Sequence, residues 1–307
     1  MKITPGAGDV GAALTAAPDV SGVMFTGSTD VARLIEASLA GRRTADGRIA
    51  PLMAETGGQN AMIVDSSALT EQVVGDVVAS AFDSAGQRCS ALRILCVQEE
   101  AADRTLAMLR GALDELAIGR TDRLSSDIGP VITDEARRTI EAHVQAMRDK
   151  GYAVSRQTLP PEAEHGTFVA PTIVEIDDIA ALKREVFGPV LHVVRYRRAD
   201  LAPLIEAINA TGYGLTFGLH TRIDETIETV LGRIAVGNVY VNRNVIGAVV
   251  GVQPFGGRGL SGTGPKAGGP LYLRRLLAAQ PEPAFRGKAP ARLLSLIHIS
   301  EPTRQAE

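Results

Sequence analysis

Cys89 carries the side chain whose surroundings best suit nucleophilic chemistry. It lies in the segment GQRCSALRIL, shortly after Gly86 and directly after Arg88. A thiol in a turn can face a cleft, and nearby backbone amides together with a guanidinium favour the reactive thiolate. An isolated cysteine is more often a small, buried, inert residue. That alternative suits Cys96, which lies inside an apolar run.

Glu55 is the candidate general base. It ends the apolar run PLMAE, and Gly57 and Gly58 follow it closely. Glycines let the backbone turn sharply, so we expect the carboxylate to face a cavity. Partial burial raises the pKa of a carboxyl group, which can then take a proton from water near neutral pH. The alternative is a solvated side chain at the end of a strand.

Two glycine patterns match the GxGxxG fingerprint of dinucleotide-binding sites, one at 6–11 and one at 257–262. That fingerprint requires a hydrophobic strand directly before it. Only MKITP precedes the first match, which therefore predicts a turn and the start of a helix. The second match follows Pro254 and Phe255 and predicts a loop.

Alternating apolar runs and amphipathic segments predict an α/β protein with largely parallel sheets. Glu55 is placed by a strand over 51–56, and Cys89 lies between a helix over 70–81 and a strand over 93–97. Further strands are expected over 20–25, 168–176, 189–196 and 239–242, and further helices over 29–39, 101–116, 134–150, 201–209 and 224–234.

Composition excludes several function classes. The net charge of −3 provides no basic field for nucleic acid or an acidic membrane. No apolar run reaches the roughly 18 residues needed to span a bilayer. The two cysteines match no metal or redox spacing, so no metal is expected. We expect a reduced, cytoplasmic protein.

Seven motifs in order along 20–269 resemble those of the NAD(P)-dependent aldehyde dehydrogenase superfamily. The separation of 34 positions between Glu55 and Cys89 is similar to that of the family. The motifs are FTGST (25–29), ETGGQNAMIV (55–64), GQRCSA (86–91), EVFGPV (185–190), YGLTFGLHT (213–221), GNVYVN (237–242) and PFGG (254–257).

Longer stretches such as FDSAGQRCSALRILC resemble the L-glutamate γ-semialdehyde (pyrroline-5-carboxylate) dehydrogenase modules of bacterial bifunctional proline utilisation A proteins. This resemblance implies NAD-dependent oxidation of the semialdehyde to L-glutamate, the second step of proline catabolism. It also implies a proline dehydrogenase module on the same parent chain and a homo-oligomer. The sequence does not show directly whether NAD or NADP is preferred. A dehydrogenase for another aldehyde and a non-catalytic scaffold of the same fold remain alternatives.

The family resemblance also implies residue roles. Cys89 attacks the aldehyde to give a thiohemiacetal and then a thioester, and Glu55 activates the water that hydrolyses it. The cofactor would be bound by Gly27 and Ser28 on its phosphate and nicotinamide side, by Glu185 at the ribose, and by Phe187 beside the ring.

Substrate contacts are implied for a second set of residues. The amides of Gly247 and Ala248 would bind the α-carboxylate as an anion nest. Ser90 would add a hydroxyl, and Phe255 and Phe82 would form an apolar wall. Core packing is the alternative for both phenylalanines.

The expected architecture is an aldehyde dehydrogenase fold that lacks its N-terminal part. It comprises the C-terminal part of a Rossmann-like NAD-binding domain (1–57), an α/β catalytic domain (58–257), and a C-terminal segment with a linker (258–292). The final stretch, 293–307, resembles a translated sequencing adapter. By resemblance, the early Rossmann strands and one oxyanion-hole asparagine lie upstream of Met1, so the chain alone is expected to be inactive and poorly folded.

Overall fold

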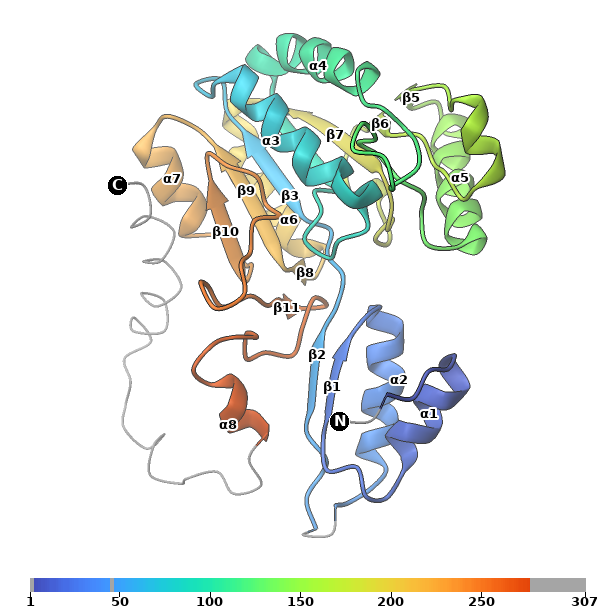
Figure 1. Ribbon diagram of the computed structural model, residues 1–307. Helices are drawn as coiled ribbons and strands as arrows, with labels where there is room; N and C mark the ends of the chain where they lie inside the picture. Colours follow the sequence, from blue (N-terminus) through green and yellow to red (C-terminus); the bar gives the residue numbers. More distant parts are fainter. Residues whose placement is uncertain (1–2, 45–46, 277–307) are drawn as a thin grey trace. The chain divides into compact units, whose positions relative to one another are not determined.

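The computed structural model describes residues 3–44 and 47–276, which form two compact units (Figure 1). Unit 1 is built from the described residues up to Gly57 together with 249–276, and unit 2 is Gly58–Ala248. Residues 249–257, expected in the catalytic domain, therefore group with unit 1. The adapter-like stretch at 293–307 lies outside the described residues.

Unit 2 is built on a seven-stranded sheet in the order β10-β9-β3-β4-β7-β6-β5. Neighbouring strands are parallel, except that β5 runs antiparallel to β6. The strands are β3 (Ala61–Val64), β4 (Ile94–Gln98), β5 (Ala153–Arg156), β6 (Thr172–Glu175), β7 (Val190–Tyr196), β9 (Thr216–His220) and β10 (Asn238–Val241), and a short β8 (Tyr213–Gly214) precedes β9.

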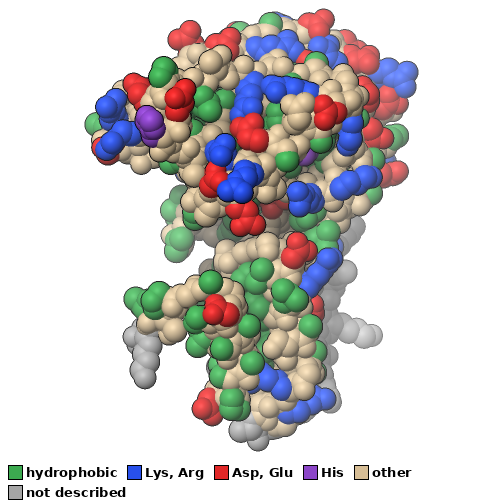
Figure 2. All heavy atoms as spheres, turned by 90° about the vertical axis from the view of Figure 1, so that its right-hand side faces the viewer, with side chains coloured by type: hydrophobic (Ala, Val, Ile, Leu, Met, Phe, Trp, Pro, Cys, Tyr) green, Lys and Arg blue, Asp and Glu red, His purple; other side chains and the backbone are tan. Residues whose placement is uncertain are grey.

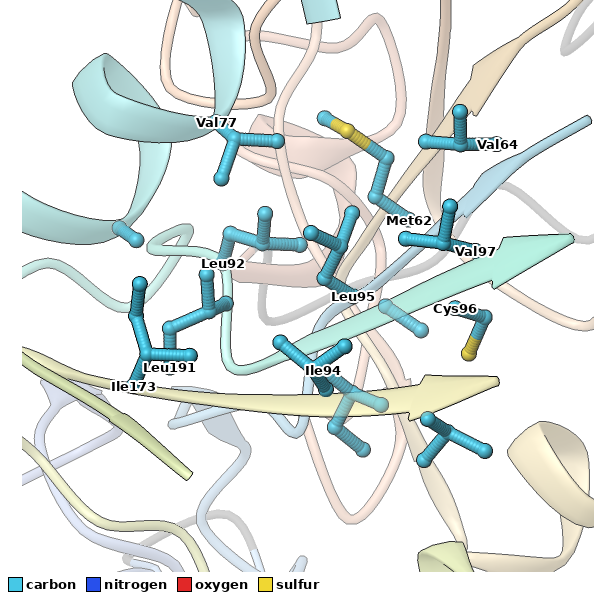
Figure 3. Close-up of a cluster of buried hydrophobic side chains, with 14 of the residues drawn as sticks. Met62, Val64, Val77, Leu92, Ile94, Leu95, Cys96, Val97, Ile173 and Leu191 are labelled. Atoms are coloured by element: carbon cyan, nitrogen blue, oxygen red, sulfur yellow. The ribbon is translucent and has the colours of Figure 1, made fainter. Parts of the chain in front are cut away.

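The central strands are buried on both faces. Every residue of β3 and β4 is buried, as expected for parallel strands with continuous apolar runs. Along β4, Leu95 and Val97 point to one side of the sheet, and Ile94 and Cys96 point to the other (Figure 3). Helices α3 and α4 pack side by side, and in Figure 1 α3 passes in front of the strands while α4 lies above them.

The helices of unit 2 follow the amphipathic segments of the sequence. Helix α5 begins at a cap in which the Thr133 hydroxyl accepts a hydrogen bond from the amide of Ala136, 3.1 Å away. The helices are α3 (Thr70–Phe82), α4 (Glu99–Asp114), α5 (Asp134–Asp149), α6 (Leu201–Ala210) and α7 (Asp224–Leu231), with short 3-10 turns η1 (Asp83–Gly86), η2 (Pro161–His165), η3 (Ile179–Ala181) and η4 (Arg198–Asp200).

Unit 1 contains a parallel pair of strands in which Thr26 lies opposite Glu55. Ile35 and Leu39 of α2 pack with Ala50 in a small core. The elements are α1 (Gly8–Ala16), β1 (Val23–Thr26), α2 (Thr29–Ala40), β2 (Leu52–Glu55), β11 (Arg258–Gly259) and α8 (Tyr272–Leu276).

Both glycine-pattern predictions are confirmed: 6–11 contains the start of α1, and most of 257–262 is loop, with the two-residue strand β11 within it. The expected helices agree with the structure to within three residues at each end. Strands β3, β5 and β9 were not predicted from the sequence. None of the described helices is long and apolar enough to cross a membrane, and no group of three metal-ligating side chains occurs among the described residues.

Candidate active site

A sharp backbone reversal between α3 and β4 carries Cys89. Ser84 and Ala85 adopt left-handed conformations with φ of 56° and 52°, and Gly86 follows with φ of 64°. A Cβ on Gly86 would lie 2.3 Å from the carbonyl oxygen of Gly188. Glycine at this position therefore serves both the turn and the close approach of two loops.

The buried amide of Asn60 fixes the backbone on either side of the cysteine. Its Nδ2 donates to the carbonyl oxygens of Cys89 (2.7 Å) and Ala91 (2.8 Å), and its Oδ1 accepts from the amide of Thr216 (3.0 Å). The Thr216 hydroxyl donates in turn to the carbonyl of Ser90 (3.2 Å). The cysteine loop is thus held by Asn60, which directly precedes β3, and by Thr216 of β9.

The two cysteines lie in different surroundings. Cys89 is half-buried, whereas Cys96 is fully buried in β4. Burial raises the pKa of the Cys96 thiol to about 12, so this side chain remains a neutral thiol at physiological pH. Reactive cysteines are partly exposed and have a nearby cation, and of the two only Cys89 is partly exposed.

Glu185 and Phe187 meet the cysteine loop at Arg93, whose side chain is only 2% exposed. The Arg93 guanidinium donates to Glu185 Oε1 (3.2 Å) and lies 5.2 Å from the centre of the Phe187 ring. Burial raises the pKa of Glu185, whereas Arg93 and the amide of Gly58 lower it. Glu185 is thus held by Arg93 and is largely shielded from solvent.

In unit 1, Glu55 lies at the end of β2, against the glycine-rich segment 254–269. Its Oε2 accepts a hydrogen bond from the amide of Gly257 at 3.0 Å. A Cβ on Gly256 would lie 2.6 Å from Oε1, and a Cβ on Gly262 would lie 3.1 Å from Oε2. Small residues therefore leave room for the carboxylate while the backbone closes around it.

This enclosure changes the acidity of Glu55. Burial raises its pKa to about 7, partly opposed by the Gly257 amide and the charge of Lys266. A carboxyl group with this pKa is substantially ionised at neutral pH, and it is a far stronger base than an ordinary glutamate. The physical condition expected of a general base is therefore present at Glu55.

Gly27 and Ser28 form the turn before α2. The Ser28 hydroxyl caps the helix by accepting from the amide of Val31 at 3.2 Å. The Gly27 amide donates to the Glu55 carbonyl at 3.2 Å, and a Cβ on Gly27 would lie 2.4 Å from the tip of the Phe25 ring. A capped helix N-terminus of this kind suits an anionic group.

The predicted substrate residues are distributed over both units. Phe82 is fully buried in the core of unit 2, in agreement with core packing. Ser90 is 8% exposed, and Gly247 and Ala248 are half-buried. Phe255 is half-buried in unit 1, where its backbone pairs with that of Ala267. Their contacts with substrate remain predictions.

Within each unit, the structure brings part of the predicted site together. Unit 1 joins Gly27 to Glu55, and unit 2 joins the Cys89 loop to Glu185 and Phe187. Asn60 and Arg93 were not predicted as functional residues from the sequence. The sequence did offer a signal: Asn60 begins NAMIV and Arg93 begins RILCV, so each polar side chain adjoins an apolar run. A polar side chain buried with such a run requires hydrogen-bond partners, which indicates a structural or functional role.

Comparisons with known proteins agree with this geometry. A family model described as the aldehyde dehydrogenase family matches residues 1–280. The bifunctional protein PutA of Escherichia coli (strain K12) is 65% identical over 291 residues, which are 93% of this chain and 22% of that protein. The chain therefore spans about a fifth of the length of such curated relatives.

Solved structures are similar as well. A crystal structure of bifunctional proline utilization A matches with a TM-score of 0.84 and 57% identity, over 88% of this chain and 27% of that one. A 1-pyrroline-5-carboxylate dehydrogenase from Thermus with bound NAD matches with a TM-score of 0.80 and 35% identity, over 89% and 52%. The ordered motifs, the fold and the family model together show that this chain belongs to the aldehyde dehydrogenase family.

Proposed function

We propose that this chain is the catalytic segment of an NAD-dependent L-glutamate γ-semialdehyde dehydrogenase, which forms L-glutamate in the second step of proline catabolism. The observation that carries the proposal is Glu55, a carboxyl group with a pKa of about 7 in a chain that also has a half-buried thiol at Cys89. The similar PutA and 1-pyrroline-5-carboxylate dehydrogenase proteins support the choice of substrate.

The mechanism divides one oxidation into an acylation and a hydrolysis. The Cys89 thiolate adds to the aldehyde carbon and forms a C–S bond, and the carbonyl becomes the oxyanion of a thiohemiacetal. A bound NAD⁺ would supply the acceptor for the hydride of that carbon, and loss of the hydride would leave a thioester on Cys89. Glu55 then takes a proton from water, whose oxygen attacks the thioester and releases the carboxylate product and the thiolate.

The residues of each unit fit a dinucleotide. In unit 1, the turn of Gly27 and the Ser28-capped start of α2 offer backbone amides without a large side chain. In unit 2, the Glu185 carboxylate suits a ribose hydroxyl, and Phe187 is 44% exposed, so a planar ring can contact it. We propose NAD on these grounds and because the similar Thermus enzyme contains it.

The proposed substrate carries an α-carboxylate, which the amides of Gly247 and Ala248 would bind. We expect the full-length protein to prefer L-glutamate γ-semialdehyde over an aldehyde of equal length without the carboxylate. Leaving the anion site unfilled costs roughly 1–3 kcal/mol, which is about fivefold to a hundredfold in kcat/KM. NADH formation measured with both aldehydes tests this.

The outcomes separate two claims. Equal kcat/KM values for the two aldehydes would remove the role of Gly247 and Ala248 but leave a dehydrogenase. Failure to form NADH from any aldehyde would favour the scaffold alternative. The perturbed pKa of Glu55 argues against a scaffold, which needs no base.

A homo-oligomer, a proline dehydrogenase module on the parent chain and a cytoplasmic location are part of the proposal.

A further inference from the structure

Arg93 is an unusual residue for the start of a central strand. Its side chain is 2% exposed, and it directly precedes β4 in the middle of the seven-stranded sheet. Burying a guanidinium is costly unless several partners compensate for the lost water. The identity of those partners therefore indicates what the residue does.

The partners of the guanidinium come from two separate loops. Nη1 donates to the carbonyl of Gly188 (3.0 Å), and Nη2 donates to the carbonyl of Arg88 (3.2 Å) and to Glu185 Oε1 (3.2 Å). Arg88 directly precedes Cys89, whereas Glu185 and Gly188 flank Phe187. One side chain thus contacts the nucleophile loop and the loop proposed to hold the cofactor.

The backbone of Arg93 gives this side chain a fixed origin. Its amide donates to the Asn60 carbonyl at 2.9 Å, and its carbonyl accepts from the amide of His192 at 2.9 Å. The His192 ring nitrogen Nδ1 also lies 3.1 Å from that carbonyl oxygen. Asn60 also binds the backbone carbonyl of Cys89 through its side chain. The backbone of Arg93 and the backbone of Cys89 are therefore held by the same residue.

Electrostatics joins the same groups. Burial lowers the pKa of Arg93, while Glu185 and the thiolate of Cys89 raise it. Interactions between charges are reciprocal, so the Arg93 cation favours a charged Cys89 and a charged Glu185. A planar, permanently charged fork is required to reach three acceptors in different directions, and a lysine ammonium lacks that shape.

We infer that Arg93 is a positioning residue that fixes the Cys89 loop and the Glu185–Gly188 loop relative to each other, so that the nucleophile and the nicotinamide side of the cofactor keep one geometry. The inference deepens the proposed function and rests on it for the identity of the cofactor. Arg93 itself contacts neither cofactor nor substrate in this assignment. It acts through Glu185, Phe187 and the backbone at Arg88.

The test uses Arg93→Lys in the full-length protein, with three readouts: the NAD dissociation constant, the alkylation rate of Cys89 by iodoacetamide without NAD, and the melting temperature. We expect NAD binding to weaken by about tenfold, as for loss of charge-assisted hydrogen bonds that orient a binding group, and alkylation to slow by several fold. The matched control is Arg110→Lys, because Arg110 is also ion-paired in unit 2 but its partners Glu175 and Ser155 belong to neither of these loops. Neither the NAD dissociation constant nor the alkylation rate should change in this control.

Each outcome decides the proposal. Loss of melting temperature with unchanged NAD binding and alkylation would make Arg93 a purely structural residue and overturn the inference. If Arg93→Lys does not fold, Arg93→Gln replaces it, and failure of both to fold also overturns the inference. Alkylation needs neither cofactor nor substrate. A wild-type protein that oxidises no semialdehyde therefore contradicts the proposed function, while the alkylation result still tests Arg93.

Discussion

At the scale of single residues, the two cysteines offer a direct test of the chemistry. We expect Cys89→Ala to abolish aldehyde oxidation by the full-length enzyme, because no other group there can form the thioester. Cys96→Ala should retain most activity, since its thiol is buried in β4 and stays protonated. NADH formation measures both variants. Comparable turnover by Cys89→Ala would remove this residue from the mechanism.

Glu55 predicts a characteristic pH dependence. The base form is the carboxylate, and burial raises its pKa to about 7. Hydrolysis of the thioester should therefore speed up as pH rises through about 7 and level off above it. The sign for stability is opposite: a raised carboxyl pKa means that the folded state retains the proton longer, so folding stability falls as pH rises from 4.5 to about 7.

Replacement of the same side chain separates the two half-reactions. Glu55→Gln keeps the shape but cannot accept a proton from water. We expect a rapid burst of NADH followed by slow steady-state turnover, measured by stopped-flow absorbance. A variant with wild-type steady-state turnover would show that another group is the base.

At the scale of elements, the turn between α3 and β4 depends on glycine. Gly86→Ala would force an L residue to φ of 64° and bring its Cβ within 2.3 Å of the Gly188 carbonyl. We expect destabilisation of roughly 1–3 kcal/mol from the strained conformation, or more with the overlap, and loss of dehydrogenase activity. Thermal unfolding and NADH formation check both effects.

The control is a glycine in the helix that directly precedes this turn. Gly75 is within α3, and a Cβ there meets nothing within 4 Å. Gly75→Ala should stabilise the protein by about 1 kcal/mol, the difference in helix propensity between the two residues. If both substitutions changed the melting temperature equally, the turn would not require its left-handed glycine.

Local sequence patterns predicted the helices and strands better than they predicted the contacts between them. The apolar periodicity of 70–81 gave α3 nearly to the residue, and the helix expected over 29–39 matches α2 to within one residue. β9 was missed because TFGLH contains Gly218 and His220, which do not suggest a buried strand, although both are buried. The ion pair of Arg93 with Glu185 joins residues 92 positions apart, and no local pattern encodes such a pair.

At the scale of the whole molecule, the surface of unit 1 carries apolar side chains. Met24, Leu34 and Val31 are 57%, 70% and 42% exposed, and hydrophobic side chains gather over the α1–α2 part of unit 1 in Figure 2. We expect this chain alone to self-associate at micromolar concentration and to bind a hydrophobic dye, because exposed apolar surface promotes association. Light scattering measures the first effect.

A charged substitution tests the source of that association. Leu34→Glu should reduce light scattering and dye binding, since it places a charge in the middle of the exposed face of α2. Ser125→Glu, at an exposed turn in unit 2, carries the same charge change and should leave scattering unaltered. Equal effects of the two variants would attribute the change to net charge alone.

The order in which the chain is synthesised has a consequence for the base. Unit 1 is discontinuous: Glu55 is made early, but Gly257, whose amide binds its carboxylate, lies 202 positions later. At the usual 5–20 residues per second, roughly ten to forty seconds separate the two. During that interval unit 2 is synthesised, and Glu55 lacks the segment that later encloses its carboxylate. The residue that would hydrolyse the thioester thus acquires its basicity only when the last part of unit 1 has been made.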